Sequence, residues 1–193
     1  MVNLFKRNME TLFDIWWKNE SEKENTKLDF YFSIKKHFGF ESYLDNENIT
    51  HSARVATTKF RLSSHCLPVE VLRYYDTDRQ DRKFNICLSN KIGDEYHYLV
   101  KCQNKGMVGI RNNFVEEAQQ ICSQLKNFSV ENIILYCSTM KDKEVQEITA
   151  NFLSNLIRQF KIEDKLPPLQ ILCLRYLGIM RKSKYRTSFN KKK

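Results

Sequence analysis

Apolar side chains recur at intervals of three and four residues along most of the chain, the spacing that gives a helix one apolar face. The first such face lies in residues 4–16, the second in residues 27–38 and the third in residues 49–63. Gly39 follows the second series and Pro68 follows the third, and both residue types commonly end a helix. This part of the chain therefore predicts three helices joined by polar loops.

The C-terminal half continues with the same helical spacing. We expect one helix over residues 114–125, after Gly106 and Gly109 have loosened the chain. A short helix should follow, capped by Ser129 and ending near Cys137. Both segments read as amphipathic helices rather than as strands.

The longest uninterrupted apolar stripe consists of Val145, Ile148, Phe152, Leu156 and Phe160. Thr139, followed by Asp142, resembles a capping box at the start of this helix, and Pro167 with Pro168 closes it. One more apolar helix is expected over residues 169–180. No series of strands alternates polar and apolar positions. The sequence thus predicts an all-α fold, a multi-helix bundle with at most a short β-hairpin.

Residues 82–102 contain two cysteines and one histidine in the manner of a small metal knuckle. Cys87, His97 and Cys102 would supply two thiolates and one imidazole, which suit the tetrahedral preference of Zn²⁺. A fourth donor is expected three residues before Cys87, where Phe84 stands instead. Candidates to complete the set are His65, Cys66, Asp94 and Glu95. A zinc site that lacks one of its usual donors is therefore our first hypothesis.

These residues also have ordinary structural roles that we weigh beside metal binding. Asp94 and Glu95 would cap the turn that begins with Gly93, since carboxylates interact favourably with exposed amides at a helix start. His65 could hydrogen-bond to nearby backbone, and Arg73 could pair with Glu70 or Asp94. Capping is the role that we prefer for the two acids.

The chain has the length of a single domain. We divide it into N-terminal helices (1–64), a knuckle segment (65–105), C-terminal helices (106–180) and a basic tail (181–193). Lys and Arg outnumber Asp and Glu by 32 to 23, and the tail contains no acidic residue. This balance favours an anionic partner such as nucleic acid, although a solvated basic surface has the same composition.

The six cysteines would form a disulfide framework only in a secreted protein. Charged residues interrupt the apolar pattern at the N-terminus, so no secretory signal is visible, and no segment has the length of a membrane span. We therefore expect an intracellular location, in the nucleus or cytoplasm, with no membrane partner. Cys122, Cys137 and Cys173 should behave as small buried apolar residues.

A specific resemblance rests on residues 54–102. Arg61 to His65 read Arg-Leu-Ser-Ser-His, and Asp94 to Cys102 read Asp-Glu-x-His-x-Leu-x-x-Cys. This order of motifs resembles the C-terminal region of LINE-type retrotransposon polyproteins, which carries a zinc knuckle associated with the reverse transcriptase. The resemblance implies that Cys87, His97 and Cys102 are metal ligands. Phe84 departs from the family pattern, as does Leu72, which stands where the relatives have glycine.

The resemblance implies a domain that binds RNA or DNA. Phosphate neutralisation would fall to Arg54, Lys59, Arg61, Arg73, Arg79, Arg82 and Lys83. Unpaired bases could stack on Tyr74, Tyr75, Tyr96 and Tyr98. The sequence has no phosphate-binding glycine loop, nucleophile elbow or paired polymerase aspartates, so we expect no catalytic activity.

Two other classes of function compete with nucleic-acid binding. A helical scaffold that docks a partner protein would show no salt-dependent affinity for an oligonucleotide, whereas counterion release makes nucleic-acid binding strongly salt-dependent. A small hydrolase with an open zinc position would need a general base, and the sequence places none.

Overall fold

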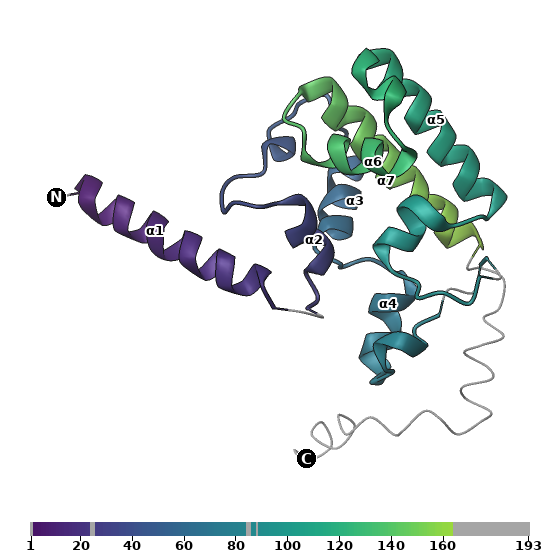
Figure 1. Cartoon of the computed structure of the whole chain (residues 1–193), viewed down its shortest axis with the longest axis horizontal. Helices are drawn as coiled ribbons and strands as arrows, with labels where there is room; N and C mark the ends of the chain where they lie inside the picture. Colours follow the sequence, from purple (N-terminus) through teal and green to yellow (C-terminus); the bar gives the residue numbers. More distant parts are fainter. Residues whose placement is uncertain (1, 24–25, 84–85, 88, 164–193) are drawn as a thin grey trace, which may run out of the picture.

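The computed structural model describes residues 2–23, 26–83, 86–87 and 89–163 (Figure 1). Its α-helices are α1 (Val2–Ser21), α2 (Asp29–Ile34), α3 (His51–Arg61), α4 (Pro68–Val71), α5 (Lys105–Ile121), α6 (Val130–Thr139) and α7 (Lys143–Glu163). Short 3₁₀ turns occupy Ser42–Leu44, Leu72–Tyr75, Arg79–Asp81 and Ser123–Asn127, and a π-helical turn occupies His97–Lys101. The described residues form no sheet, and their only β pairing is an antiparallel bridge between Lys83 and Ile92. The all-α prediction is confirmed.

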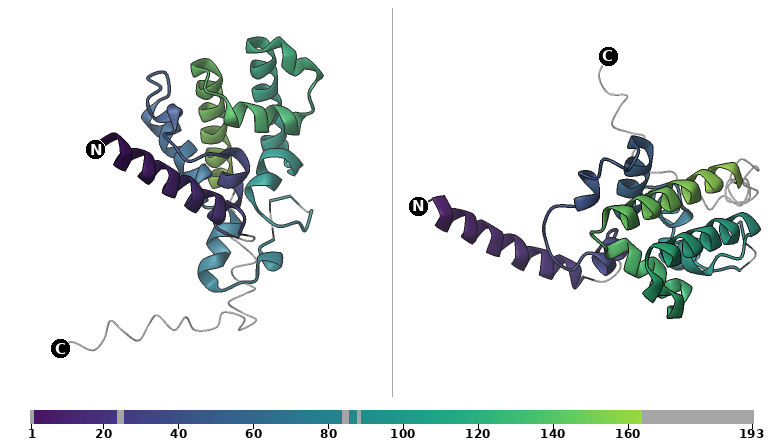
Figure 2. Two further views of the ribbon diagram at one scale, coloured as in Figure 1. Left: turned by 60° about the vertical axis from the view of Figure 1, so that its left-hand side comes forward. Right: turned by 90° about the horizontal axis from the view of Figure 1, so that it is seen from above.

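The core lies where α7 packs between α3 and α5, with α6 across one end (Figures 1 and 2). Phe114 of α5 stacks on Phe152 of α7, with ring centroids 4.2 Å apart. Leu156 and Phe160 of α7 are buried below them, as the long apolar stripe predicts. This apolar burial supplies the dominant favourable free energy of the bundle.

Helix α1 extends away from this bundle (Figure 1 and the right view of Figure 2). The helix was predicted, but its apolar face is mostly exposed, including Leu4, Phe5 and Leu12. Only its last turns pack: Trp17 is buried and its ring lies edge-on to Phe32, with centroids 5.1 Å apart. Most of the predicted apolar face is therefore available to other surfaces.

The second and fourth predicted helices have different bounds from those expected. Helix α2 stops at Ile34, and the chain is extended at Lys35. Helix α5 begins at Lys105, because the side chain of Asn104 accepts hydrogen bonds from the amides of Gly106 and Met107. The expectation that Gly106 loosens the chain is wrong, since this residue is helical.

Gly106 lies against the side chain of Gln159 in α7. A Cβ atom at this position would lie 2.6 Å from the side-chain nitrogen of Gln159. A larger residue here would therefore require the flexible end of that glutamine to move. Gly109 is helical as well and has open space beside it.

The caps of the later helices are partly as expected. Ser129 accepts a hydrogen bond from the amide of Asn132 and caps α6, as predicted. The cap of α7 is Asp142, whose carboxylate accepts from the amides of Glu144 and Val145. Thr139 instead ends α6, so the predicted capping box does not form.

Several predictions fall outside the described residues. They are the helix over 169–180, Cys173, the basic tail and the side chain of Phe84. Among the helices that the structure describes, none combines the length and hydrophobicity that a membrane span requires.

Candidate metal centre

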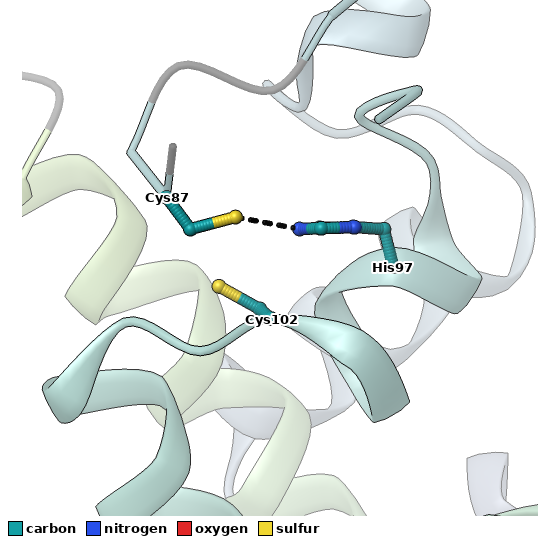
Figure 3. A group of neighbouring side chains, drawn as sticks. All are labelled: Cys87, His97 and Cys102. Atoms are coloured by element: carbon teal, nitrogen blue, oxygen red, sulfur yellow. Dashed lines mark hydrogen bonds between the residues drawn. The ribbon is translucent and has the colours of Figure 1, made fainter. Parts of the chain in front are cut away.

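The three donors of the predicted knuckle converge in the structure. Cys87 Sγ lies 3.1 Å from His97 Nε2, and the donor atoms of Cys87, His97 and Cys102 all lie within 4.8 Å of one another. Their side chains point toward a common centre (Figure 3). Cys87 lies before the π turn, His97 is the first residue of the turn, and Cys102 follows it. All three residues are buried, with exposed fractions of 8%, 4% and 0%.

This arrangement fits a metal ion of tetrahedral preference. Bond lengths of about 2.3 Å to sulfur and 2.1 Å to nitrogen separate tetrahedral donors by roughly 3.6–3.8 Å. The observed spacing brackets these separations, so a small side-chain adjustment would seat an ion. Two thiols and an imidazole are also the donor set that binds Zn²⁺ well. The group can therefore hold a metal ion.

The π turn brings His97 and Cys102 together. The amide of Cys102 donates to the carbonyl of His97 at 2.7 Å, a hydrogen bond that spans five residues. This wider turn places the two side chains one turn apart on the same face, and single π turns are frequent at functional sites. Asp94 fixes the start of the turn, because its carboxylate accepts from the amide of His97 at 2.8 Å. The capping role that we preferred for Asp94 is confirmed.

A buried arginine holds the other end of the π turn. Arg111 of α5 donates from Nε to the carbonyl of Leu99 at 2.7 Å, and from Nη2 to the carbonyls of Cys102 at 3.0 Å and Tyr98 at 3.3 Å. These are the acceptors that a helix end leaves without partners. Arg111 therefore fixes the backbone that carries Cys102 and places a positive charge beside the thiol.

Sequence reasoning missed Arg111, although a signal was present. It lies on the buried face of α5 with Met107, Phe114 and Ala118, at the spacing of an apolar stripe. A charged residue in such a stripe needs buried partners, which here are carbonyl oxygens.

In the absence of an ion, the surroundings favour the neutral imidazole of His97 and the neutral thiol of Cys102. Burial lowers the pKa of His97, and the charge of Arg111 lowers it further against the opposing effect of Asp94. Burial and the neighbouring Cys87 raise the pKa of the Cys102 thiol to about 11, although the charge of Arg111 opposes this rise. A metal ion would displace the thiol protons, so its affinity should increase with pH.

The predicted fourth ligand, His65, has other partners. Its Nε2 lies 2.8 Å from a carboxylate oxygen of Glu95, and its Nδ1 accepts from the amide of Leu67 at 3.3 Å. Ser63 donates to the same oxygen of Glu95. The structure does not bring His65 to the donor group, because its Nε2 faces Glu95, just before the π turn, and its Nδ1 binds the amide of Leu67, just before α4 (Pro68–Val71).

The other candidates for a fourth donor lie outside the group as well. The carboxylate of Glu95 accepts from Ser63 and lies 2.8 Å from His65 Nε2, and the donor group does not contain it. Burial would raise the pKa of Glu95, but its bond to His65, the charge of that ring and the bond from Ser63 lower it. Among the described residues, the donor group contains neither Cys66 nor Asp94.

All five of the predicted nucleic-acid arginines have structural partners, beginning with the two in α3. Arg54 donates to the carbonyls of Asn46 and Ile49, just before α3. Arg61 pairs with Glu41 at 2.7 Å and donates to the carbonyl of Ser138. Both arginines thus join elements of the fold, so phosphate binding would have to compete with these contacts.

The other residues predicted to contact phosphate lie on the surface or line a cavity. Arg73, Arg79 and Arg82 line one cavity, Lys59 is exposed on α3, and Lys83 is half-buried beside its bridge to Ile92.

Of the predicted stacking residues, Tyr75 and Tyr96 are exposed. Tyr98 is only 1% exposed and packs edge-on against Phe160, with centroids 5.3 Å apart, so its prediction as a stacking platform is wrong. The side chain of Tyr74 lies outside the described residues.

Comparison of the chain with family models, curated proteins and solved structures finds no match in any of the three. The LINE resemblance is therefore untested by relatives and stays a prediction. What the structure shows directly is an all-α fold with a buried Cys/His group that can hold a metal ion.

Proposed function

We propose that this chain is an intracellular nucleic-acid-binding domain, acting in the nucleus or cytoplasm, in which Cys87, His97 and Cys102 hold Zn²⁺. We further propose that it derives from the C-terminal region of a LINE-type retrotransposon polyprotein and has no catalytic activity. The observation that carries this proposal is the convergence of the three donors, which come from positions up to 15 residues apart in the chain. Buried sulfur and imidazole donors at one point are the arrangement that a knuckle requires.

The role of the metal in this proposal is structural. An ion on these donors would tie the chain at Cys87 to the π turn that carries His97 and Cys102. The chain just before Cys87 supplies Arg73, Arg79 and Arg82 to one cavity. Fixing this segment would hold the three guanidinium groups in place for an anionic partner.

Metal content is the first test. We expect about one zinc per chain in the purified protein, since two thiolates and one imidazole converge at a buried point. The variants Cys87→Ser and His97→Ala should lose it. Cys122→Ser, which removes a half-buried cysteine outside the donor group, is the matched control and should retain it. Equal zinc content in all four proteins, or none in any of them, would exclude the knuckle.

Nucleic-acid binding is tested by salt titration. Fluorescence anisotropy with a labelled random single-stranded oligonucleotide should give an affinity that falls steeply as salt rises. Cys102→Ser should weaken binding if the metal organises the cationic segment. A failure to bind the oligonucleotide at low salt would refute the proposed function.

A second candidate, the helical interaction scaffold, is favoured by one observation. Helix α1 projects from the bundle (Figure 1). Its side chains Leu4, Phe5, Leu12 and Trp16 are exposed. Apolar side chains presented together on a surface commonly mark interaction sites. If α1 is the functional surface, the double variant Leu4→Glu, Leu12→Glu should abolish binding of the partner protein. If α1 is not the functional surface, the same variant should leave the affinity for the oligonucleotide nearly unchanged.

A further inference from the structure

A cavity of about 490 Å³ opens beside the segment that follows α3. Its walls come from the region around α2, from residues 63–82 and from the residues that begin the π turn. Pockets of roughly 300–1,000 Å³ are typical of small-molecule sites. The cavity can therefore admit a ligand of the size of one nucleotide.

One wall of this cavity is cationic. Arg82 donates from Nε to the carbonyl of Thr77 at 2.9 Å and from Nη1 to the carbonyl of Val69 at 3.1 Å, which fixes the plane of its guanidinium. Burial and the positive charges of Arg73 and Arg79 lower the pKa of Arg82, whereas the charges of Glu70 and Asp78 oppose this shift. Because Arg73, Arg79 and Arg82 all line the same cavity, an anion bound in it would lie near all three guanidinium groups.

The carboxylates near this wall neutralise it only in part. Arg73 pairs with Glu70 at 3.0 Å, whereas Arg79 lies 3.5 Å from Asp29 and is about one-third exposed. Within the described part of the chain, Arg82 has no carboxylate at ion-pair distance, and its two carbonyl bonds leave Nη2 for another acceptor. A phosphate group presents the oxygen acceptors that such a set of guanidinium groups binds.

Other residues of the lining have a different character. They are the carboxylates of Asp94 and Glu95 and the ring of Tyr96, which is 39% exposed and has Lys101 Nζ 5.4 Å from its centroid. One oxygen of Asp94 accepts from the amide of His97, and one oxygen of Glu95 accepts from Ser63 and His65, which fixes both groups. An aromatic face next to fixed acceptors suits a base that carries an exocyclic amino group.

We propose that this cavity binds one nucleotide, with its phosphate against Arg73, Arg79 and Arg82 and an amino-bearing base against Tyr96, Asp94 and Glu95. This inference deepens the proposed function and rests on it, because the nucleotide would belong to a bound strand. It predicts selectivity within a strand: adenine, cytosine and guanine carry an amino group, and uracil and thymine do not. A uniformly basic surface would show no such preference.

The test uses the full chain and adenosine 5′-monophosphate as the probe, with binding measured by calorimetry. Arg73→Gln and Arg79→Gln should each raise the dissociation constant about tenfold, since each removes a charge-assisted contact to phosphate. Arg7→Gln, an equal loss of charge on the exposed part of α1, should leave it unchanged. Tyr96→Ala should weaken binding while Tyr96→Phe preserves it, and uridine 5′-monophosphate should bind more weakly than the adenosine probe.

Each outcome decides one of the two proposals. No saturable binding of the probe at millimolar concentration, or equal affinities in Arg79→Gln and Arg7→Gln, overturns the nucleotide pocket. If the oligonucleotide still binds in that case with the usual salt dependence, the proposed function survives. If the probe binds as expected but the oligonucleotide does not, the pocket stands and the proposed function fails. Circular dichroism and zinc content of each variant exclude misfolding as the cause.

Discussion

The helical bundle and the segment between α3 and α5 share one apolar core but differ in their buried polar groups. In the bundle, α7 buries Phe152, Leu156 and Phe160 against its neighbours. The segment adds Leu67, Tyr98 and Leu99 to the same core. It also buries Ser63, Glu95 and His97, which make hydrogen bonds. The bundle therefore depends mainly on burial of apolar area, whereas the segment depends in addition on the geometry of polar partners.

This difference indicates which part of the molecule can respond to a ligand. Apolar burial has no strict directional requirement and is insensitive to metal ions. Buried polar groups cost free energy unless each has a partner at the right position. A metal ion at the Cys/His group, or an anion beside the arginines, would therefore act on the segment and leave the bundle nearly unchanged.

The largest expected effect comes from the bundle itself. Leu156→Ala should lower the free energy of unfolding by about 4 kcal/mol, because it removes a fully buried side chain and leaves a cavity. Chemical denaturation measures this loss, and it should be the same with and without a zinc chelator. Val55→Ala, at a largely exposed position of α3, is the control and should cost much less. If the loss of unfolding free energy in Leu156→Ala depended strongly on the chelator, the bundle and the segment would not be energetically independent.

Metal removal tests the segment. Chelation should lower stability by about 3–4 kcal/mol at zinc concentrations of 100 to 1,000 times the dissociation constant. The loss should be confined to the segment, so hydrogen exchange should increase at the amides of residues 97–102 and stay constant in α7. Cys102→Ser should reproduce the effect of the chelator and Cys122→Ser should not. Uniform acceleration across α7 would contradict this prediction.

Arg111 connects the two regions, since it lies in α5 and binds the carbonyls at the end of the π turn. Arg111→Met should weaken zinc binding by about 10–100-fold, the range found for residues that orient metal ligands. Competition with a chromophoric chelator measures the affinity. Arg158→Met, which removes an arginine of α7 that lines a different pocket, is the matched control. An unchanged zinc affinity in Arg111→Met would show that the turn is fixed without it.

The smallest expected effect is pH-dependent and lies far from the metal site. Glu41 accepts from Tyr31 at 2.6 Å and pairs with Lys35 at 2.9 Å and Arg61 at 2.7 Å. Burial alone would raise the pKa of Glu41, but the bond from Tyr31 and the charges of Arg61 and Lys35 lower it below the usual 4.5.

Because the pKa of Glu41 is lower in the folded chain, its contribution is complete above the usual value and is lost as pH falls below it. Glu41→Gln should therefore reduce stability by about 1–2 kcal/mol at neutral pH and by less in acid. Denaturation at several pH values measures the difference. Glu144→Gln, at an exposed position in the first turn of α7, is the control and should change this pH dependence little. A constant loss from Glu41→Gln at every pH would show that the carboxylate charge is not involved.

The helices and the three donors could be predicted from the sequence, since both depend on spacing along the chain. The stripe from Val145 to Phe160 predicted α7, and the knuckle pattern predicted the donor group. The cap of α7 was placed too early, because Thr139 and Asp142 are both capping residues and only packing decides between them. The fourth-ligand candidate His65 failed for a similar reason: its partner Glu95 lies 30 residues later, and no local pattern reveals that pair.

The sequence by itself determined the helical class and the identity of the three donors, because helical periodicity and side-chain chemistry are local properties. The tertiary structure alone decided that the face of α1 is exposed, that Arg111 supports the π turn, and that Arg73, Arg79 and Arg82 share one cavity. These features depend on distances between segments far apart in the chain, which are fixed only when the bundle packs.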